Sequence, residues 1–248
     1  MKTKFFFFLA IVFSLQVCGQ KTDASKLMLK GQVKTIHEYN YQAIGKDSNI
    51  QKGVLNFSYY NTFDKQGNKI VDIKYDTTGK IDKKYEYLRD NSGRRTEQNQ
   101  YTSAGKLKRK ITYKYDEKGN VIEDNSYNAE GKLEKKYTYR YDWKGNLIVD
   151  MSFDSENNFL SRYSYTYDSI GNKIENSRYS TEGNLDKKIN YIYDVNKNLI
   201  EEIQIAGDGS KQNYYYTYLF DKKGNWIQKI SFKGKIADSF VSREIGYY

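Results

Sequence analysis

The clearest pattern along the chain is an alternation in which apolar or aromatic residues tend to occupy every second position. In residues 133–141 one side carries Leu133, Lys135, Tyr137, Tyr139 and Tyr141, and the other carries Glu134, Lys136, Thr138 and Arg140. A period of two places alternate side chains on opposite faces of an extended strand, whereas an amphipathic helix needs a period of about 3.6. The pattern therefore predicts β-strands.

Short polar runs separate these strands and recur along the chain. An aspartate returns every 26 residues, with one last step of 27, at Asp64, Asp90, Asp116, Asp142, Asp168, Asp194 and Asp221. A glycine stands three residues after six of these seven aspartates. A similar turn motif lies between successive aspartates, as in Tyr127 to Gly131. Aspartate can begin a type I turn, and glycine accepts the positive φ that follows. At the exception, Lys197 either bears a strained conformation or shifts its turn to use Asn196.

We therefore expect an all-β fold of tandem antiparallel β-hairpin repeats with a 26-residue period. About 15 to 16 consecutive strands would form one long sheet, twisted or rolled by the ordinary twist between neighbours. The chain divides into a signal peptide (1–19), an N-terminal capping hairpin (20–52), the repeat domain (53–232) and a C-terminal capping strand (233–248). The caps would shield the open edges of the sheet.

Equal pairing on both sides of each turn predicts which residues share a face. It places Tyr139 opposite Val149 and Asp124 opposite Lys136. The tyrosines would then share one face with aromatic residues that flank the other turns, such as Tyr127, and the aspartates would lie on a charged, solvated face. That charged face would also hold a column of isoleucines, for which the alternation gives no reason: Ile70, Ile122, Ile148, Ile174, Ile200 and Ile227.

The first residues have the charged start and apolar middle of a secretory signal. The apolar run from Phe5 to Val17 is shorter than the roughly 20 residues of a membrane-spanning helix, and no second such run follows. Cleavage before Gln20 would release the chain, whereas lipoprotein processing would place lipid on Cys18 and anchor it to a membrane surface. Both routes stay open, and we expect a periplasmic, cell-surface or extracellular protein.

Composition narrows the classes of function. The chain has 26 tyrosines, no proline, one cysteine, one histidine and a net charge of +10. Acidic and basic residues are interleaved, so no dense basic patch predicts specific nucleic-acid binding. His37 is the single histidine, and there is no phosphate-binding loop or nucleophile motif. We therefore expect no enzyme, no cofactor and no metal site.

Two sequence strings carry a family resemblance. Residues 135–147 contain Tyr139, Tyr141, Asp142, Gly145 and Leu147 in the order of the signature Tyr-x-Tyr-Asp-x-x-Gly-Arg/Asn-Leu. This string resembles the YD repeat of Rhs-type bacterial surface proteins, and residues 127–133 resemble the bacterial variant of MORN repeats. The resemblance implies strands wound into a shell but no toxin, since the proline-containing cleavage motif of Rhs proteins is absent. A tyrosine- and lysine-rich exported chain also suggests a Bacteroidetes-like source.

The tyrosine face is the candidate binding surface. We expect its binding residues to be Tyr87, Tyr113, Tyr139, Tyr165, Tyr191 and Lys135. Two interpretations stay open: the rings line a wet groove and stack on sugars, or they pack on one another and on Leu107, Leu133 and Leu185 as a core. The function we expect is a binding module in the cell envelope, with a glycan or an envelope protein as partner. The alternative is a structural or assembly scaffold.

Overall fold

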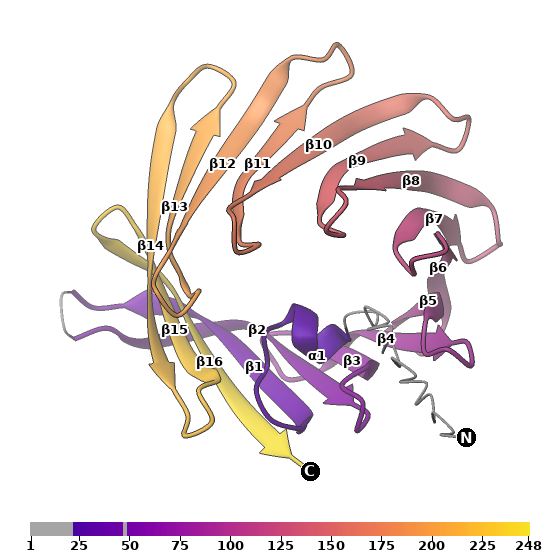
Figure 1. Cartoon of the computed structure of the whole chain (residues 1–248). Coiled ribbons are helices and arrows are strands. Elements are labelled where there is room, and N and C mark those ends of the chain that lie inside the picture. Colours follow the sequence, from indigo (N-terminus) through magenta and orange to yellow (C-terminus); the bar gives the residue numbers. More distant parts are fainter. Residues whose placement is uncertain (1–21, 47–48) are drawn as a thin grey trace, which may run out of the picture.

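A computed structural model describes residues 22–46 and 49–248, and its strands form one closed antiparallel barrel (Figure 1). The predicted signal peptide and Cys18 lie outside the described residues. The elements are α1 (Asp23–Lys26), β1 (Val33–Ile44), β2 (Gln51–Phe63), β3 (Lys69–Tyr75), β4 (Ile81–Arg89), β5 (Arg95–Thr102), β6 (Leu107–Tyr115), β7 (Val121–Asn128), β8 (Leu133–Tyr141), β9 (Leu147–Asp154), β10 (Phe159–Tyr167), β11 (Lys173–Tyr179), β12 (Leu185–Tyr193), β13 (Leu199–Ala206), β14 (Lys211–Phe220), β15 (Trp226–Lys233) and β16 (Ile236–Tyr247).

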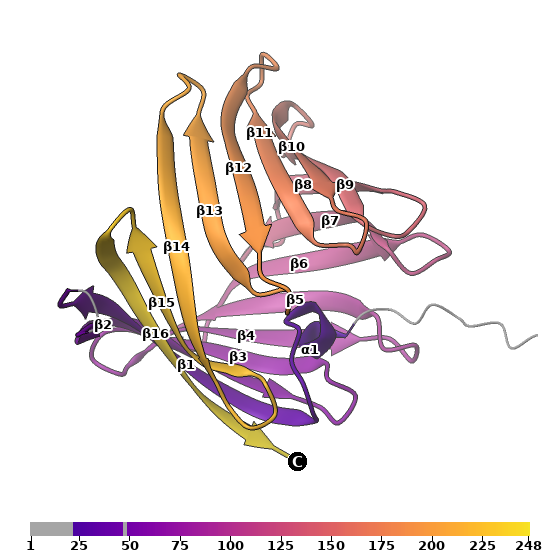
Figure 2. The same ribbon diagram turned by 60° about the vertical axis from the view of Figure 1, so that its left-hand side comes forward.

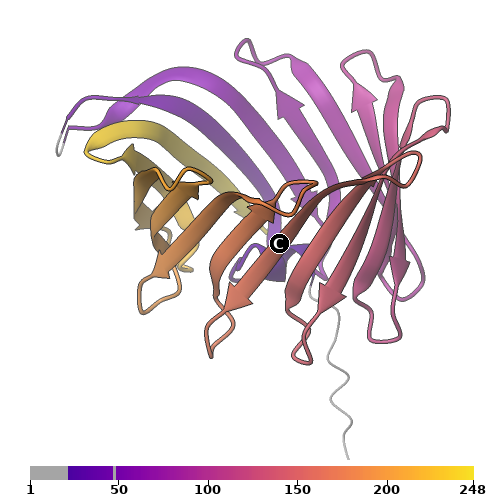
Figure 3. The same ribbon diagram turned by 90° about the horizontal axis from the view of Figure 1, so that it is seen from above.

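The barrel closes where the first strand meets the last. β1 pairs antiparallel with β16, from Val33 opposite Tyr247 to Gln42 opposite Ser239, and the other strands follow in chain order. Figures 2 and 3 show the ring of strands from the side and from above. The sequence predicted a twisted or rolled sheet and left open whether it closes, and the structure shows a closed barrel. The two terminal strands, expected to cap free edges, pair with each other and leave no edge.

The aspartate turns are built as their residue types predict. At Asp142, the carboxylate oxygen Oδ1 accepts hydrogen bonds from the backbone N–H groups of Lys144 at 2.9 Å and Asn146 at 2.8 Å. Gly145 follows with a φ of +81°. At the exceptional turn, Lys197 keeps the glycine position with a φ of +67°, so the strained alternative is the one observed.

Replacing Gly145 by valine should destabilise the protein more than replacing Lys144 by valine. A Cβ atom at Gly145 would meet only Asn120 Oδ1, at 3.8 Å, so space is not the difficulty. The difficulty is the positive φ, because a β-branched residue with that φ costs on the order of 1 kcal/mol or more. Urea unfolding of both variants measures the difference, and equal midpoints would contradict this account of the turn.

The strand register differs by one residue from equal pairing. Arg140 pairs with Val149, and Ile148 is an extra residue on β9, a β-bulge, so that Tyr139 faces Asp150 instead of Val149. Isoleucine fills the same extra position in six hairpins: Ile70, Ile122, Ile148, Ile174, Ile200 and Ile227. The bulge is therefore the structural place of the isoleucine column that the alternation left unexplained.

A shift of one residue moves side chains from one face of a strand to the other. Asp124 faces Tyr113 and Tyr137 in place of Lys136, so it belongs to the tyrosine face. Tyr127 is an odd number of positions from Asp124 on β7 and lies on the opposite face. The predicted charge pairs and the predicted common face for all aromatic residues are therefore wrong, because equal pairing ignored the bulges.

The tyrosine face lines the inside of the barrel. α1 lies within the ring of strands (Figures 1 and 3), and its Asp23 forms an ion pair with Arg89, which alternates with Tyr87 on β4. The opposite face is the outer wall, where ion pairs such as Lys114 with Glu123, at 2.8 Å, lie in solvent. The inner wall is thus aromatic and the outer wall charged.

Buried apolar side chains gather where the barrel closes. Among the described residues they are Val33, Ile36 and Ala43 on β1, Phe63 on β2, and Phe240 and Val241 on β16. No described tyrosine is buried, and Leu107 and Leu185 are more than one-third exposed. The buried apolar core thus lies at the seam of the barrel, and the tyrosines of the inner wall are partly buried around it. A ring of this many strands is too wide for inner side chains to meet across its centre.

Residues 22–32, which we call the strap, extend along one mouth of the barrel. At one end the backbone N–H of Ala24 donates to the carbonyl oxygen of Gly67 in the β2–β3 turn, at 2.8 Å. At the other end the backbone of Lys30 both donates to and accepts from the side-chain amide of Asn225, at 2.7 and 2.8 Å. Between these points Leu29 packs against the buried cluster of β1 and β2. The strap is thus held to aspartate turns far apart in the sequence.

Candidate functional site

Tyrosine hydroxyls on the inner wall donate to polar side chains of neighbouring strands. Tyr139 donates to Asp124 and Tyr165 to Asp150, both at 2.5 Å. The same link joins Tyr87 to Asp72 at 3.0 Å and Tyr113 to Gln98 at 3.2 Å. Each of these bonds spans 15 residues, so the repeat of the hairpins builds the row. The hydroxyls are held in place while the rings remain only half-buried.

A second row of hydroxyls lies nearer the mouth and binds backbone. Tyr115, Tyr141, Tyr167 and Tyr193 donate to the carbonyl oxygens of Arg95, Val121, Leu147 and Lys173, at 2.6 to 2.8 Å. These carbonyls belong to residues that begin strands, where the bulges interrupt the ladder. Burial raises the pKa of Tyr141 to about 12, still further above neutral pH than the ordinary tyrosine value, and its hydroxyl is a donor there. The inner wall is therefore ordered by hydrogen bonds across strands.

Two carboxyl groups of the inner wall are made weaker acids by their surroundings. Burial raises the pKa of Asp124, against the hydrogen bond from Tyr139, and the charge of Asp150 raises it further. Burial likewise raises the pKa of Asp150. The turn aspartate Asp142 differs, because hydrogen bonds from the backbone and side chain of Asn146 hold its pKa below the usual range.

Replacing Asp124 by asparagine should stabilise the protein at neutral pH and leave it unchanged in acid. A carboxyl group whose pKa is raised by folding stabilises the folded state below its unfolded pKa, and that stability is lost as pH rises through the folded pKa. Asp142→Asn should do the reverse: it destabilises at neutral pH, and its effect vanishes as pH falls. Thermal unfolding of both variants at pH values from about 3 to about 8, a range that includes the ordinary aspartate pKa, measures the opposite trends.

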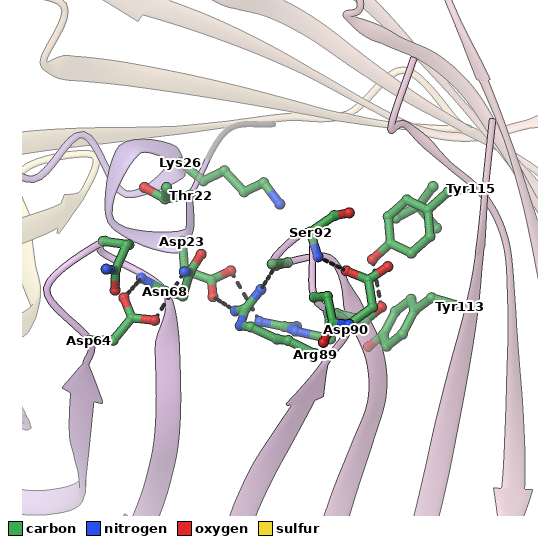
Figure 4. Close-up of a pocket in the computed structure, with 15 residues that line it drawn as sticks. Thr22, Asp23, Lys26, Asp64, Asn68, Arg89, Asp90, Ser92, Tyr113 and Tyr115 are labelled. Carbon is green, nitrogen blue, oxygen red and sulfur yellow. Dashed lines mark hydrogen bonds and ion pairs between the residues drawn. The ribbon is translucent and has the colours of Figure 1, made fainter. Parts of the chain in front are cut away.

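The mouth cavity, of about 640 Å³, lies where the strap meets the inner wall (Figure 4). Asp23 of α1 lies at its centre and joins two arginines of the barrel. Its Oδ2 atom is 2.5 Å from Arg89 Nη2, and its Oδ1 atom is 3.1 Å from Arg95 Nη2. The rings of Tyr113 and Tyr115 form the opposite side in Figure 4. The cavity therefore combines charged groups with aromatic rings.

The charges of the mouth cavity are balanced. Burial alone would raise the pKa of Asp23, but Arg95, the backbone N–H of Lys69 and Arg89 together hold that pKa below its usual value. The guanidinium of Arg95 also lies over the ring of Tyr87, 4.1 Å from its centroid. The two arginines are thus fixed by contacts on several sides, and the polar atoms of the cavity are preorganised.

The structure places the predicted binding residues in different surroundings. Tyr113 lines the mouth cavity, and Tyr139 and Tyr87 line smaller hollows of about 570 and 250 Å³. Tyr165 continues the row of hydroxyls along the wall. Tyr191 is next along that wall, and Lys135 lies opposite Ser126 on β7, towards the other mouth. The predicted tyrosine column thus forms one surface along the inner wall. Of its members, Tyr113 is the one that lines the mouth cavity.

Sequence reasoning missed the group formed by Asp23, Arg89 and Arg95. A signal was present, because Arg89 stands where the following units have Tyr115 and Tyr141. Arg95 likewise stands where those units have aliphatic residues. Arg89 is thus the one basic residue at its position in the repeat, whereas the position of Arg95 is also basic at Lys69 and Lys173.

The described residues offer groups for binding. Within residues 22–46 and 49–248, no cluster of three or more His, Cys, Asp or Glu side chains could hold a metal ion. No helix in the described part of the chain is long and apolar enough to cross a membrane.

His37 lies on the outer wall with its ring against Tyr39, whose hydroxyl is 2.8 Å from His37 Nδ1. Ring faces, carboxylates and guanidinium groups are what the inner wall presents.

Comparison with known proteins places the chain in a family. A family model described as "Uncharacterised protein" matches residues 45–169, half of the chain. The chain belongs to this family. No curated protein matches the sequence.

The chain is similar to several solved structures, of which one shares its fold. A porin-like protein from Bacteroides uniformis is similar with a TM-score of 0.59 and 10% identity, over 88% of this chain and 99% of that one. A porin-like protein from Bacteroides vulgatus has a TM-score of 0.42 and 14% identity, over 87% and 98%. The Tc holotoxin pore of Photorhabdus luminescens has a TM-score of 0.35 and 16% identity, over 83% and 11%. The first likeness shows the fold alone, and the YD-repeat resemblance stays an expectation.

Proposed function

We propose that the protein is an exported binding module, without enzymatic activity, that holds a glycan against the inner wall of its barrel. The observation that carries the proposal is the half-buried row of tyrosines, whose hydroxyls are fixed by Asp124, Asp150 and their counterparts, while none of the tyrosines that the structure describes is fully buried. Rigid aromatic rings with an exposed face offer a large contact area at little entropic cost. They suit the apolar faces of sugar rings.

The mouth cavity is the place where we expect binding to start. Tyr113 and Tyr115 supply ring surface there, and Asp90, Ser92 and Asn68 supply polar groups for sugar hydroxyls. Its volume of about 640 Å³ lies within the range of roughly 300–1,000 Å³ of small-molecule sites. A longer glycan would continue along the inner wall towards Tyr139.

We further propose that the protein works in the cell envelope, at the surface or in the periplasm. The predicted signal peptide of residues 1–19 supports export. The similar protein from Bacteroides uniformis is described as porin-like, a word that belongs to envelope proteins. Whether Cys18 carries lipid is separate from this proposal.

A glycan array followed by calorimetry with the exported chain tests the proposal. For a glycan that binds, Tyr113→Ala should weaken the affinity about tenfold, the equivalent of one aromatic contact. Tyr113→Phe should keep most of the affinity, because the ring remains. Tyr127→Ala, on the outer wall, is the matched control and should bind as the wild type does.

The alternative function is a structural or assembly scaffold. The two rows of hydroxyls that bind Asp124, Asp150 and the backbone also suit a stiff shell with no small ligand. Absence of any array signal, together with capture of a defined envelope protein after crosslinking, would favour the scaffold and reject glycan binding.

A further inference from the structure

A second cavity, of about 440 Å³, lies beside the other end of the strap. We call it the aromatic cavity. The strap contributes Met28 and Lys30 to its lining, and the barrel contributes Lys197, Phe220, Trp226 and Arg243. It shares no lining residue with the mouth cavity. The two cavities can therefore be tested separately.

Backbone strain is concentrated at the aromatic cavity. Three non-glycine residues in the described part of the chain have left-handed φ values: Met28 at +53°, Lys197 at +67° and Asn157 at +68°. The first two line this cavity. Met28 follows the C-cap of α1, where glycine is the usual residue, and Lys197 replaces the glycine of the other aspartate turns. Strained residues that glycine would relieve are a mark of functional sites.

The repeat is also broken at this cavity. Trp226 stands where the earlier units have residues such as Leu199, and Phe220 stands where the preceding units have Tyr193 and Tyr167, as Phe63 does in the first unit. β14 has ten residues where β12 has nine, and the step between Asp194 and Asp221 is 27 residues instead of 26. Lys197 and Trp226, which both depart from the repeat, thus line one cavity.

The charge of the aromatic cavity is positive, unlike that of the mouth cavity. No carboxylate is among its described lining residues, whereas Lys30, Lys197 and Arg243 are. Arg243 is fixed in place, since its Nε atom is 2.7 Å from Glu38 and its guanidinium lies 3.3 Å from the centroid of Trp226. The two lysines add positive charge at the rim. The nearby turn carboxylates of Asp194 and Asp221 already accept hydrogen bonds from their own turns.

We propose that the aromatic cavity binds a small amphipathic anion, with an apolar body and one carboxylate or sulfonate group. Met28, Phe220 and Trp226 would enclose the body, and Lys197 and Lys30 would attract the anionic end. Glycine at Met28 or Lys197 would relieve strain but remove an apolar wall or a charge. The proposal does not depend on glycan binding at the mouth cavity.

Anilinonaphthalene sulfonate serves as the fluorescent probe, displaced by octanoate or by the uncharged octanol. The wild type should bind the probe saturably, and octanoate should displace it at lower concentration than octanol does. Lys197→Gly should melt at a higher temperature yet bind octanoate about tenfold more weakly, with octanol unchanged. Met28→Gly should also be more stable, and should bind both ligands more weakly. Because both variants gain stability, lost binding cannot come from unfolding.

Asn157→Gly is the matched control, since it relieves the same kind of strain in a turn at the opposite mouth. It should melt slightly higher and bind as the wild type does. Saturable octanoate binding that Lys197→Gly and Met28→Gly both leave unchanged would overturn the proposal, as would a wild type that binds neither probe nor octanoate. A failed glycan array would leave these results untouched, so the two proposals fail separately.

Discussion

Replacing Phe63 by alanine should lower the free energy of unfolding by about 3–5 kcal/mol, the usual loss for a fully buried aromatic ring. Phe63 is 1% exposed and packs with Val33 and Ile36, at 2% and 3%. Leu29 of the strap packs against the same cluster. Since most buried apolar residues lie at the seam between β2, β1 and β16, a cavity here weakens the contact that closes the barrel.

Leu88→Ala is the control, because Leu88 is 52% exposed on the outer wall. Its loss should stay within about 0.5 kcal/mol. Guanidinium unfolding followed by tryptophan fluorescence measures both variants. Similar midpoints for Phe63→Ala and Leu88→Ala would show that the seam is not the stabilising core of the barrel.

The positions of the strands could be predicted from the sequence because the turn signals are local. Asp142 and Gly145 lie three residues apart, and the geometry they favour needs only their own backbone. Alternation around Tyr139 then gives the strand between turns. These features depend on neighbours in the sequence, so one chain suffices to recognise them.

The register could not be predicted, because one bulge reverses the outcome of a long alternation. Isoleucine is common in strands, so the residue type of Ile148 does not indicate that it has no partner across the hairpin. Only its return in unit after unit, as at Ile122 and Ile174, hinted at a special position. Pairing without bulges therefore assigned Asp124 and Asp150 to the wrong face of their strands.

Closure and the strap depend on contacts between distant residues. Val33 meets Tyr247 across more than 200 positions, and Asp23 reaches Arg95 across 72. Neither contact has a local pattern. The twist of the sheet allowed a closed or an open form, and the choice between them rests on the pairing of the two terminal strands.

Replacing Tyr139 by alanine should cost about 2–3 kcal/mol, less than the loss of a fully buried ring but more than a surface change. The ring is half-buried on the inner wall, and its hydroxyl donates to Asp124 at 2.5 Å. Thr138, its neighbour on the outer wall, is the matched control. The Thr138 hydroxyl has no hydrogen-bond partner among the described residues, so Thr138→Ala breaks no hydrogen bond and should cost clearly less than Tyr139→Ala.

Tyr139→Phe separates the hydroxyl from the ring. It leaves the Asp124 carboxylate half-buried without its donor, so it should account for about 1–2 kcal/mol of the loss at neutral pH. In the background Asp124→Asn the same change should cost clearly less, because no charge is then left without a partner. Urea unfolding of the four members of this cycle gives the coupling energy. A coupling near zero would mean that the row of hydroxyls does not stabilise the inner wall, and that the tyrosines are held there by ring contacts alone.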